Sequence, residues 1–335
     1  MRVEPAMYAA LLLSALHMIS PERADHFSIS IEHEPGLSTA YPCVIEYPQT
    51  PSTRAAVLFS GGLVADIDWS VPGSIEHQGN TIELTISGEA TRDGKTIADA
   101  LLDAGFIVVR YSSVPEGQRL TNTPPIAFPA TVELAQLAWD QAVERTGLDP
   151  SRIGIVGHSM GATRGVLTSN GQAGGYVLMA GAYITPTMES PRTLAEQATS
   201  NPSAKDTTDY DGSGEVSGWE LAANEAIATS TVRASDRLTN NGQEYPWPSD
   251  LLIEHDARVC GIWGGLDNIS YHAPVLEHLY EAANKDQSVE SLETVYFPEL
   301  GHQLCEEADG LIGPIDAAVV QHIVHWLDQT IPAEH

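Results

Sequence analysis

From residue 54 onward, short apolar segments typical of buried strands alternate with longer segments of helical periodicity. The strand-like segments are residues 55–60, 106–110, 152–156, 176–180, 257–263 and 292–297. The helical segments are residues 94–104, 131–146, 162–168, 274–284 and 315–329. This alternation produces a parallel sheet covered by helices. The sequence therefore predicts an α/β fold with a mostly parallel sheet flanked by helices.

Between residues 185 and 250 the composition changes to proline, serine, threonine, asparagine and acidic residues. We interpret this segment as a cap inserted into a core made of residues 24–184 and 251–335. A chain of 335 residues that is 42% hydrophobic is large enough for one such core plus an insertion.

The N-terminal residues 1–23 contain an apolar stretch, residues 6–19, that resembles the hydrophobic region of a secretory signal peptide. This favours a secreted or periplasmic protein. Glu4 and His17 depart from the signal pattern, so an amphipathic N-terminal helix in a cytoplasmic protein is the alternative. The stretch is too short to span a bilayer, and we expect no stable membrane insertion.

Acidic residues outnumber basic ones by 45 to 16, which gives a formal net charge of −29. Such a surface repels phosphates, so nucleic acid is excluded as a partner. The three cysteines, Cys43, Cys260 and Cys305, allow at most one bridge. A Cys260–Cys305 bridge and two buried thiols are both compatible with the sequence.

The segment Gly157-His-Ser159-Met-Gly161 stands between a predicted strand and a predicted helix. A serine hydroxyl needs a nearby base and a sharp turn that exposes it, and glycines two residues before and after it leave room for that turn. An ordinary strand-to-helix turn is the alternative, and the strand before the motif and the helix after it favour the catalytic interpretation. We therefore predict that Ser159 is a catalytic nucleophile.

A histidine and a carboxylate that could assist Ser159 follow it in the order that this arrangement requires, each in a loop after a late strand. Asp267 follows the first of these strands and His302 the second. His302 would accept the serine proton, and Asp267 would hold its imidazole in the correct tautomer. Glu277 and Asp256 remain alternative carboxylates if the strand register differs.

Two backbone N–H groups are needed to stabilise the oxyanion that forms during acyl transfer. The amide that follows the nucleophile, that of Met160, is one candidate. The second is Gly62, in the Ser-Gly-Gly-Leu segment after the first predicted core strand, because glycine lets the backbone approach a substrate closely.

These motifs resemble the α/β-hydrolase superfamily, and within it the bacterial esterase and prolyl-oligopeptidase-like branches. The likeness rests on residues 57–62, 97–106, 109–111, 157–161, 263–267 and 298–302. The sequence departs from those families in two places. Ser112-Ser-Val-Pro-Glu-Gly replaces their common Asp-x-Arg-Gly loop, which leaves the substrate open. No histidine precedes the Gly61-Gly62 pair, which weakens the placement of the second oxyanion donor.

The resemblance implies the α/β-hydrolase fold and a serine hydrolase that cleaves a small-molecule carboxylic ester through an acyl-serine, with no cofactor in catalysis. A peptidase or a thioesterase could use the same residues. A calcium-dependent binding protein without catalysis is the alternative from another class.

Residues 209–220 match the twelve-residue loop of an EF-hand, with glycine at position six for the sharp turn. The predicted Ca²⁺ ligands are Asp209, Asp211, Ser213, Glu215 through its carbonyl, Ser217 through water, and Glu220. The sequence before the loop is a poor helix and no second loop pairs with it. We expect a structural Ca²⁺ that orders the cap; an acidic, solvated turn is the alternative.

Overall fold

The computed structural model describes residues 23–34, 36–61, 65–70, 74–77, 80–83, 91–120, 128–181, 245–265, 267, 291–305 and 313–334. Several predictions fall outside these residues: the signal segment, nearly all of the cap with its calcium loop, the helix at 274–284, and Gly62.

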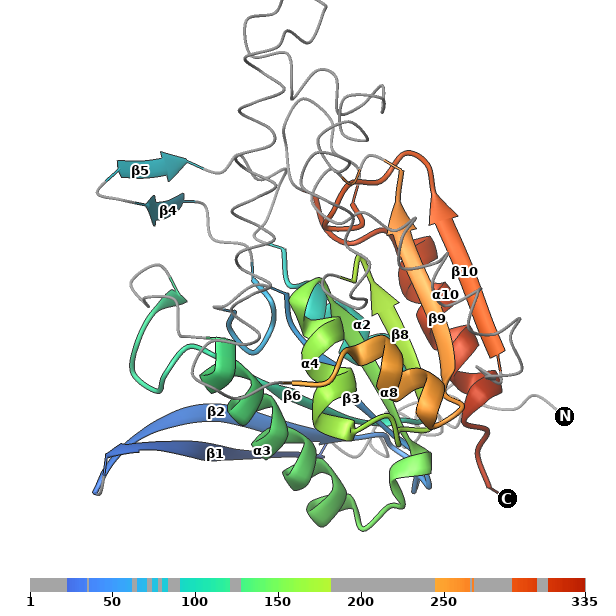
Figure 1. The fold of residues 1–335 in the computed structure, drawn as a ribbon, viewed down its shortest axis with the longest axis horizontal. Helices are drawn as coiled ribbons and strands as arrows, with labels where there is room; N and C mark the ends of the chain where they lie inside the picture. Colours follow the sequence, from blue (N-terminus) through green and yellow to red (C-terminus); the bar gives the residue numbers. More distant parts are fainter. Residues whose placement is uncertain are drawn as a thin grey trace, which may run out of the picture.

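Within the described residues, eight strands form one sheet in the order β1-β2-β6-β3-β7-β8-β9-β10 (Figure 1). They are β1 (Arg23–Glu34), β2 (Leu37–Tyr47), β3 (Ala55–Phe59), β6 (Ile107–Tyr111), β7 (Ile153–His158), β8 (Gly175–Met179), β9 (Arg258–Gly264) and β10 (Ser291–Phe297). The pairs β1–β2 and β2–β6 are antiparallel, and every other neighbouring pair is parallel. The predicted mostly parallel sheet is confirmed.

A hairpin of β1 and β2 extends the sheet beyond the predicted strands, with Arg23 opposite Tyr47 at one end of the pairing. Strand β1 carries Phe27, Ile29 and Ile31 at every second position, the pattern of a strand with one buried face. This period-two signal is visible in the sequence and predicts a strand over these residues. A second, separate hairpin pairs β4 (Ser74–His77) with β5 (Asn80–Glu83).

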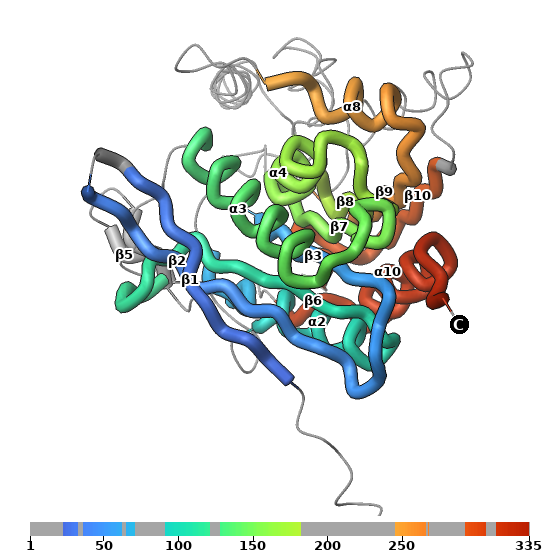
Figure 2. Tube along the Cα trace, turned by 90° about the horizontal axis from the view of Figure 1, so that it is seen from below, coloured from blue at the N-terminus to red at the C-terminus, as the bar shows by residue number. Residues whose placement is uncertain are grey.

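Helices cover both faces of the sheet (Figure 2). One face carries α3 (Phe128–Thr146), α4 (Met160–Ser169) and α8 (Pro248–Glu254); the other carries α2 (Asp93–Asp103) and α10 (Ala317–Thr330). None of the helices in the described ranges is long and apolar enough to cross a membrane.

The central strands are almost entirely apolar, with Arg110 of β6 and His158 of β7 as buried exceptions, because both of their faces are buried. In β3, Ala55, Val57 and Phe59 face the α3–α4 side, whereas Ala56 and Leu58 face the α2–α10 side. The two core clusters are therefore built from alternate residues of the same strands. Because the strands from β6 to β10 in the sheet order run parallel, their carboxyl ends lie together at one edge of the sheet.

Cys43, Cys260 and Cys305 are buried as thiols, so the sequence alternative without a bridge is the one observed. Burial raises the pKa of the Cys43 thiol to about 12 and also raises that of Cys260. Both groups are therefore protonated at neutral pH and behave as small apolar side chains.

Candidate active site

Ser159 stands at the sharp turn between β7 and α4. Its backbone angles, φ 51° and ψ −122°, lie in a region that residues with a side chain rarely adopt. The Ser159 N–H donates to the carbonyl of Met179 on β8 at 2.8 Å, which ties the turn to the neighbouring strand. The predicted strand, strained turn and helix are all present around this serine.

The glycines around Ser159 are required by close backbone packing. A Cβ at Gly157 would stand 2.6 Å from the Cα of Ala162, and one at Gly161 would stand 2.0 Å from the carbonyl oxygen of Phe59. No real Cβ atom approaches a neighbour so closely. Gly157 therefore lets the first turn of α4 pack against the end of β7, and Gly161 lets it pack against the end of β3.

His302 and Asp267 lie together in the loops that follow β10 and β9. Nδ1 of His302 is 3.0 Å from both carboxylate oxygens of Asp267. Both residues are buried, and the Asp267 side chain is fully shielded from solvent. Because a carboxylate can only accept, Nδ1 carries the proton and Nε2 is left as a proton acceptor. Asp267, rather than Asp256, is the carboxylate that contacts His302.

The loops that carry Asp267 and His302 are packed backbone against backbone. A Cβ at Gly264 would stand 2.2 Å from the Leu300 carbonyl oxygen, and one at Gly265 would stand 2.4 Å from that of Pro298. The Gly265 N–H also donates to the carbonyl of Phe297 at 2.7 Å. The paired glycines therefore allow the carboxylate to reach the imidazole.

The same site contains a further buried residue, His158, which directly precedes Ser159 and was not among the predicted site residues. Its Nε2 is 2.9 Å from the main-chain carbonyl of His302, and the two imidazole rings are 5.0 Å apart between centroids. No local pattern could reveal this contact, because the partner is a backbone group 144 residues away in the sequence.

Of the two predicted oxyanion donors, Met160 lies within the described residues and Gly62 does not. Met160 is the first residue of α4, and the first N–H groups of a helix have no partner within the helix, so its amide is available to a ligand. Gly62 lies outside the described residues and stays a prediction.

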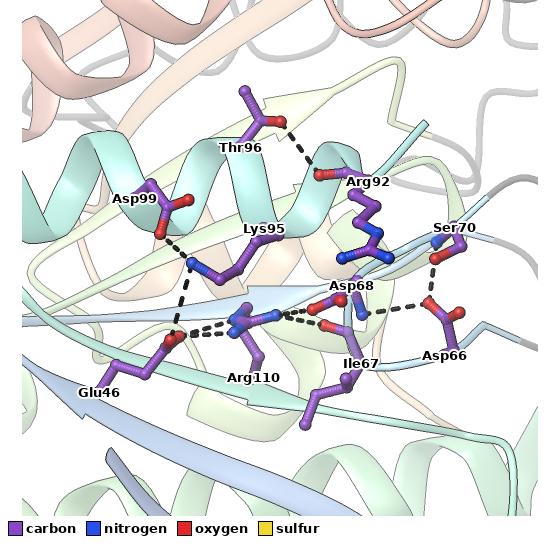
Figure 3. A network of polar contacts seen from close by, with 10 residues as sticks. All are labelled: Glu46, Asp66, Ile67, Asp68, Ser70, Arg92, Lys95, Thr96, Asp99 and Arg110. Atoms are coloured by element: carbon purple, nitrogen blue, oxygen red, sulfur yellow. Dashed lines mark hydrogen bonds and ion pairs between the residues drawn. The ribbon is translucent and has the colours of Figure 1, made fainter. Parts of the chain in front are cut away.

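Residues 65–70, which follow β3 after a short interval, are held by a polar network centred on Arg110 of β6 (Figure 3). Arg110 donates to the Glu46 carboxylate at 3.0 and 2.6 Å, to the Ile67 carbonyl at 2.9 Å, and to the Asp68 carboxylate. Arg110 and Glu46 are both buried. Their pairing satisfies charges that would be costly alone, and anchors this segment to β2 and β6.

Among the residues that the structure describes, no three histidine, cysteine or acidic side chains gather as metal ligands. The predicted calcium ligands at residues 209–220 are not among them.

A groove of about 500 Å³ lies away from the Ser159 turn, at the amino ends of β9 and β10. It is lined by Arg258, Leu292, Glu293, Trp326, Gln329 and Thr330. Asp267 and His302 follow the opposite ends of the same two strands, so this groove belongs to a different part of the molecule.

No protein-family model and no curated protein matches the chain. Solved structures do. A fungal esterase from Rhizomucor miehei is 14% identical, with 98% of this chain and 91% of that chain covered and a TM-score of 0.52. Brefeldin A esterase, a bacterial homologue of human hormone-sensitive lipase, is 16% identical over 98% and 86% of the two chains, also with a TM-score of 0.52. An esterase from Pseudomonas putida is 13% identical over 98% and 88%, with a TM-score of 0.51.

The chain has the α/β-hydrolase fold. At identities this low the likeness concerns the fold, because a fold alone does not determine a reaction. Within the α/β-hydrolase fold, Ser159, Asp267 and His302 all lie beyond the carboxyl ends of parallel strands, where such sheets bind their ligands.

Proposed function

We propose that this protein is a serine hydrolase that cleaves carboxylic esters through an acyl-serine intermediate. The observation that carries the proposal is the combination of a strained strand-to-helix turn at Ser159 with a buried His302–Asp267 pair from the following strand ends. Neither feature is needed to stabilise a sheet: the turn costs conformational energy, and the pair buries a carboxylate.

In this mechanism the Oγ of Ser159 attacks the ester carbonyl carbon while His302 Nε2 accepts the serine proton. Asp267 stabilises the imidazolium that results and keeps Nδ1 protonated. The Met160 amide, together with the Gly62 amide, donates to the oxyanion. His302 then passes the proton to the departing alcohol, and water attacks the acyl-serine with His302 again as base.

We place carboxylic esters ahead of peptides and thioesters because the structural neighbours that share the fold over nearly the whole chain are described as esterases. The prolyl-oligopeptidase-like branch has no corresponding support among them. Within ester chemistry, the acyl chain length and the alcohol are open to experiment.

The test is hydrolysis of p-nitrophenyl esters from acetate to palmitate by the wild type and by Ser159→Ala. We expect the Ser159→Ala variant to lose activity by at least about 10⁴-fold, because the covalent route is removed. A fluorophosphonate probe should label the wild type and not the variant.

Three outcomes would redirect or reject the assignment. Turnover of thioesters or peptides in place of oxygen esters would keep the serine mechanism and change the substrate. A folded wild type that is neither labelled nor active on any of these substrates would favour the non-catalytic calcium-dependent binding protein. Equal activity in Ser159→Ala would move the nucleophile elsewhere.

We also propose that residues 209–220 bind a structural Ca²⁺, on the strength of the ligand spacing alone. Binding to the folded state raises stability by linkage, by about 2.7 kcal/mol at a hundred times the Kd. Calcium should therefore raise the Tm of the wild type, and Asp209→Ala should abolish the shift. An equal shift in Asp209→Ala would mean that calcium binds elsewhere.

A further inference from the structure

His158 connects three segments of the candidate site. It is the last residue of β7 and precedes Ser159 directly. Its Nε2 lies 2.9 Å from the main-chain oxygen of His302. On the other side of the ring, Nδ1 lies against Gly61, where a Cβ would stand only 2.5 Å away. The ring thus fills the space between the segment after β3 and the loop of His302.

The chemistry of these contacts fixes the tautomer of His158. A carbonyl oxygen only accepts hydrogen bonds, so Nε2 of His158 must carry a proton. The mechanism proposed above uses neither nitrogen of this ring, since Nε2 is bonded to a backbone carbonyl and Nδ1 is covered by Gly61. His158 is therefore a poor candidate for the proton acceptor.

The ring is also neutral at physiological pH. Burial, and to a lesser extent the neighbouring His302, lower the pKa of His158 to about 4. A neutral ring can donate to the His302 carbonyl without placing a second positive charge next to the imidazolium that forms during turnover.

We propose that His158 is a positioning residue for His302, acting on its backbone while Asp267 acts on its side chain. Asp267 determines the orientation of the imidazole ring through Nδ1. His158 determines where the main chain that carries this ring lies relative to Ser159, its own neighbour in sequence. This role presupposes the serine hydrolase activity proposed above, and it adds a residue that neither attacks the substrate nor transfers a proton.

The first experiment compares His158→Leu and His158→Gln with the wild type in steady-state ester hydrolysis. Leucine removes the donor, and we expect kcat to fall about 10- to 100-fold with KM changed little, because a base displaced by a fraction of an ångström loses proton transfer rather than binding. Glutamine keeps an N–H donor for the carbonyl and should restore most of the loss. His325→Leu, at an exposed histidine of α10, is the matched control and should behave as the wild type.

Wild-type kcat in His158→Leu would overturn the proposal, as would equal losses in the leucine and glutamine variants. If His158→Leu does not fold, ¹⁵N NMR of the histidines of the wild type tests the proposal instead. The resonances of His158 are assigned as those that are missing from the spectrum of His158→Gln. We expect a neutral ring protonated at Nε2. A ring protonated at Nδ1, or charged at neutral pH, would contradict the proposal.

A third readout separates this proposal from the activity on which it depends. The proton on His302 Nδ1 should give a downfield ¹H resonance that is absent in His302→Ala. Should the wild type hydrolyse no ester and resist fluorophosphonate, the activity proposal fails, and this resonance still reports on His302. Its loss or broadening in His158→Leu, with recovery in His158→Gln, supports positioning; an unchanged resonance in both overturns it.

Discussion

The two halves of the candidate site are held in place by different forces. Around Ser159 the restraint is shape: Gly157 and Gly161 bring backbone atoms so close that no side chain fits between them. Around His302 the loops are closely packed too, but hydrogen bonds add a polar restraint: its ring contacts Asp267, and its carbonyl accepts from His158. A restraint by shape fails when atoms are added and is indifferent to pH. A restraint by hydrogen bonds tolerates isosteres of the right polarity and fails when a donor, acceptor or charge changes.

Among the changes that test this comparison, Asp267→Asn should have the largest effect. It keeps the volume of the side chain that holds His302 and changes its hydrogen bonding. An asparagine amide can turn its NH₂ toward His302 Nδ1 and so stabilise the wrong tautomer of the base. We expect kcat for ester hydrolysis to fall by roughly 10³- to 10⁴-fold while the protein stays folded.

Asp99→Asn makes the same change at an exposed carboxylate paired with Lys95 and serves as the control. Retention of more than about a tenth of wild-type kcat in Asp267→Asn would show that Asp267 does not control the tautomer of His302.

The next largest effect should come from Gly161→Ala, which adds one methyl group to the closely packed backbone next to Ser159. Because its Cβ would meet the carbonyl oxygens of Phe59 and Ser60 at 2.0 and 2.4 Å, β3 and α4 must move apart. We expect the free energy of unfolding to fall by about 3 kcal/mol, measured by chemical denaturation.

Gly147→Ala separates this steric effect from backbone strain. Gly147 has φ +65° and open space around its missing Cβ, so alanine there should cost only about 1 kcal/mol. A loss at Gly161 no larger than that at Gly147 would mean that β3 and α4 accommodate the added methyl group, and that close packing does not require glycine at 161.

The smallest effect is a difference in the pH dependence of stability. The pKa of His158 is about 4 when folded and about 6.5 when exposed, so between these values the unfolded chain binds a proton that the folded protein excludes. The contribution of His158 to wild-type stability should therefore rise by about 2.5 kcal/mol from pH 4 to pH 6.5, be fully present above pH 6.5, and be lost again on acidification. His158→Leu should lack this contribution.

The quantity to measure is the free energy of unfolding of the wild type minus that of His158→Leu at each pH. Asp93 has the opposite influence, because burial raises its pKa to about 6, yet it is present in both proteins and cancels in the difference. A difference that stays constant from pH 4 to pH 7 would show that His158 titrates alike in the folded and unfolded states.

The parallel part of the sheet and the tight turn at Ser159 could be predicted from the sequence, because each depends on local patterns. The order of the chain also suggested Asp267 and His302 as catalytic partners of Ser159, a role that stays a prediction. Apolar runs mark buried strands, and glycines beside Ser159 mark a tight turn. Strand β1 has a local signal too, the alternation of Phe27, Ile29 and Ile31. This strand lies before residue 54, where the predicted alternation of strands and helices begins.

Only the tertiary structure could select Asp267 over Asp256, or reveal that His158 contacts the His302 backbone. Both facts depend on which loops meet at the edge of the sheet, and the order of strands β8, β9 and β10 in space decides that. The same holds for Arg110, whose partners Glu46 and Asp68 come from segments far from it in sequence. A main-chain carbonyl can accept a hydrogen bond whatever the side chain of its residue, so no pattern in the sequence indicates such a contact.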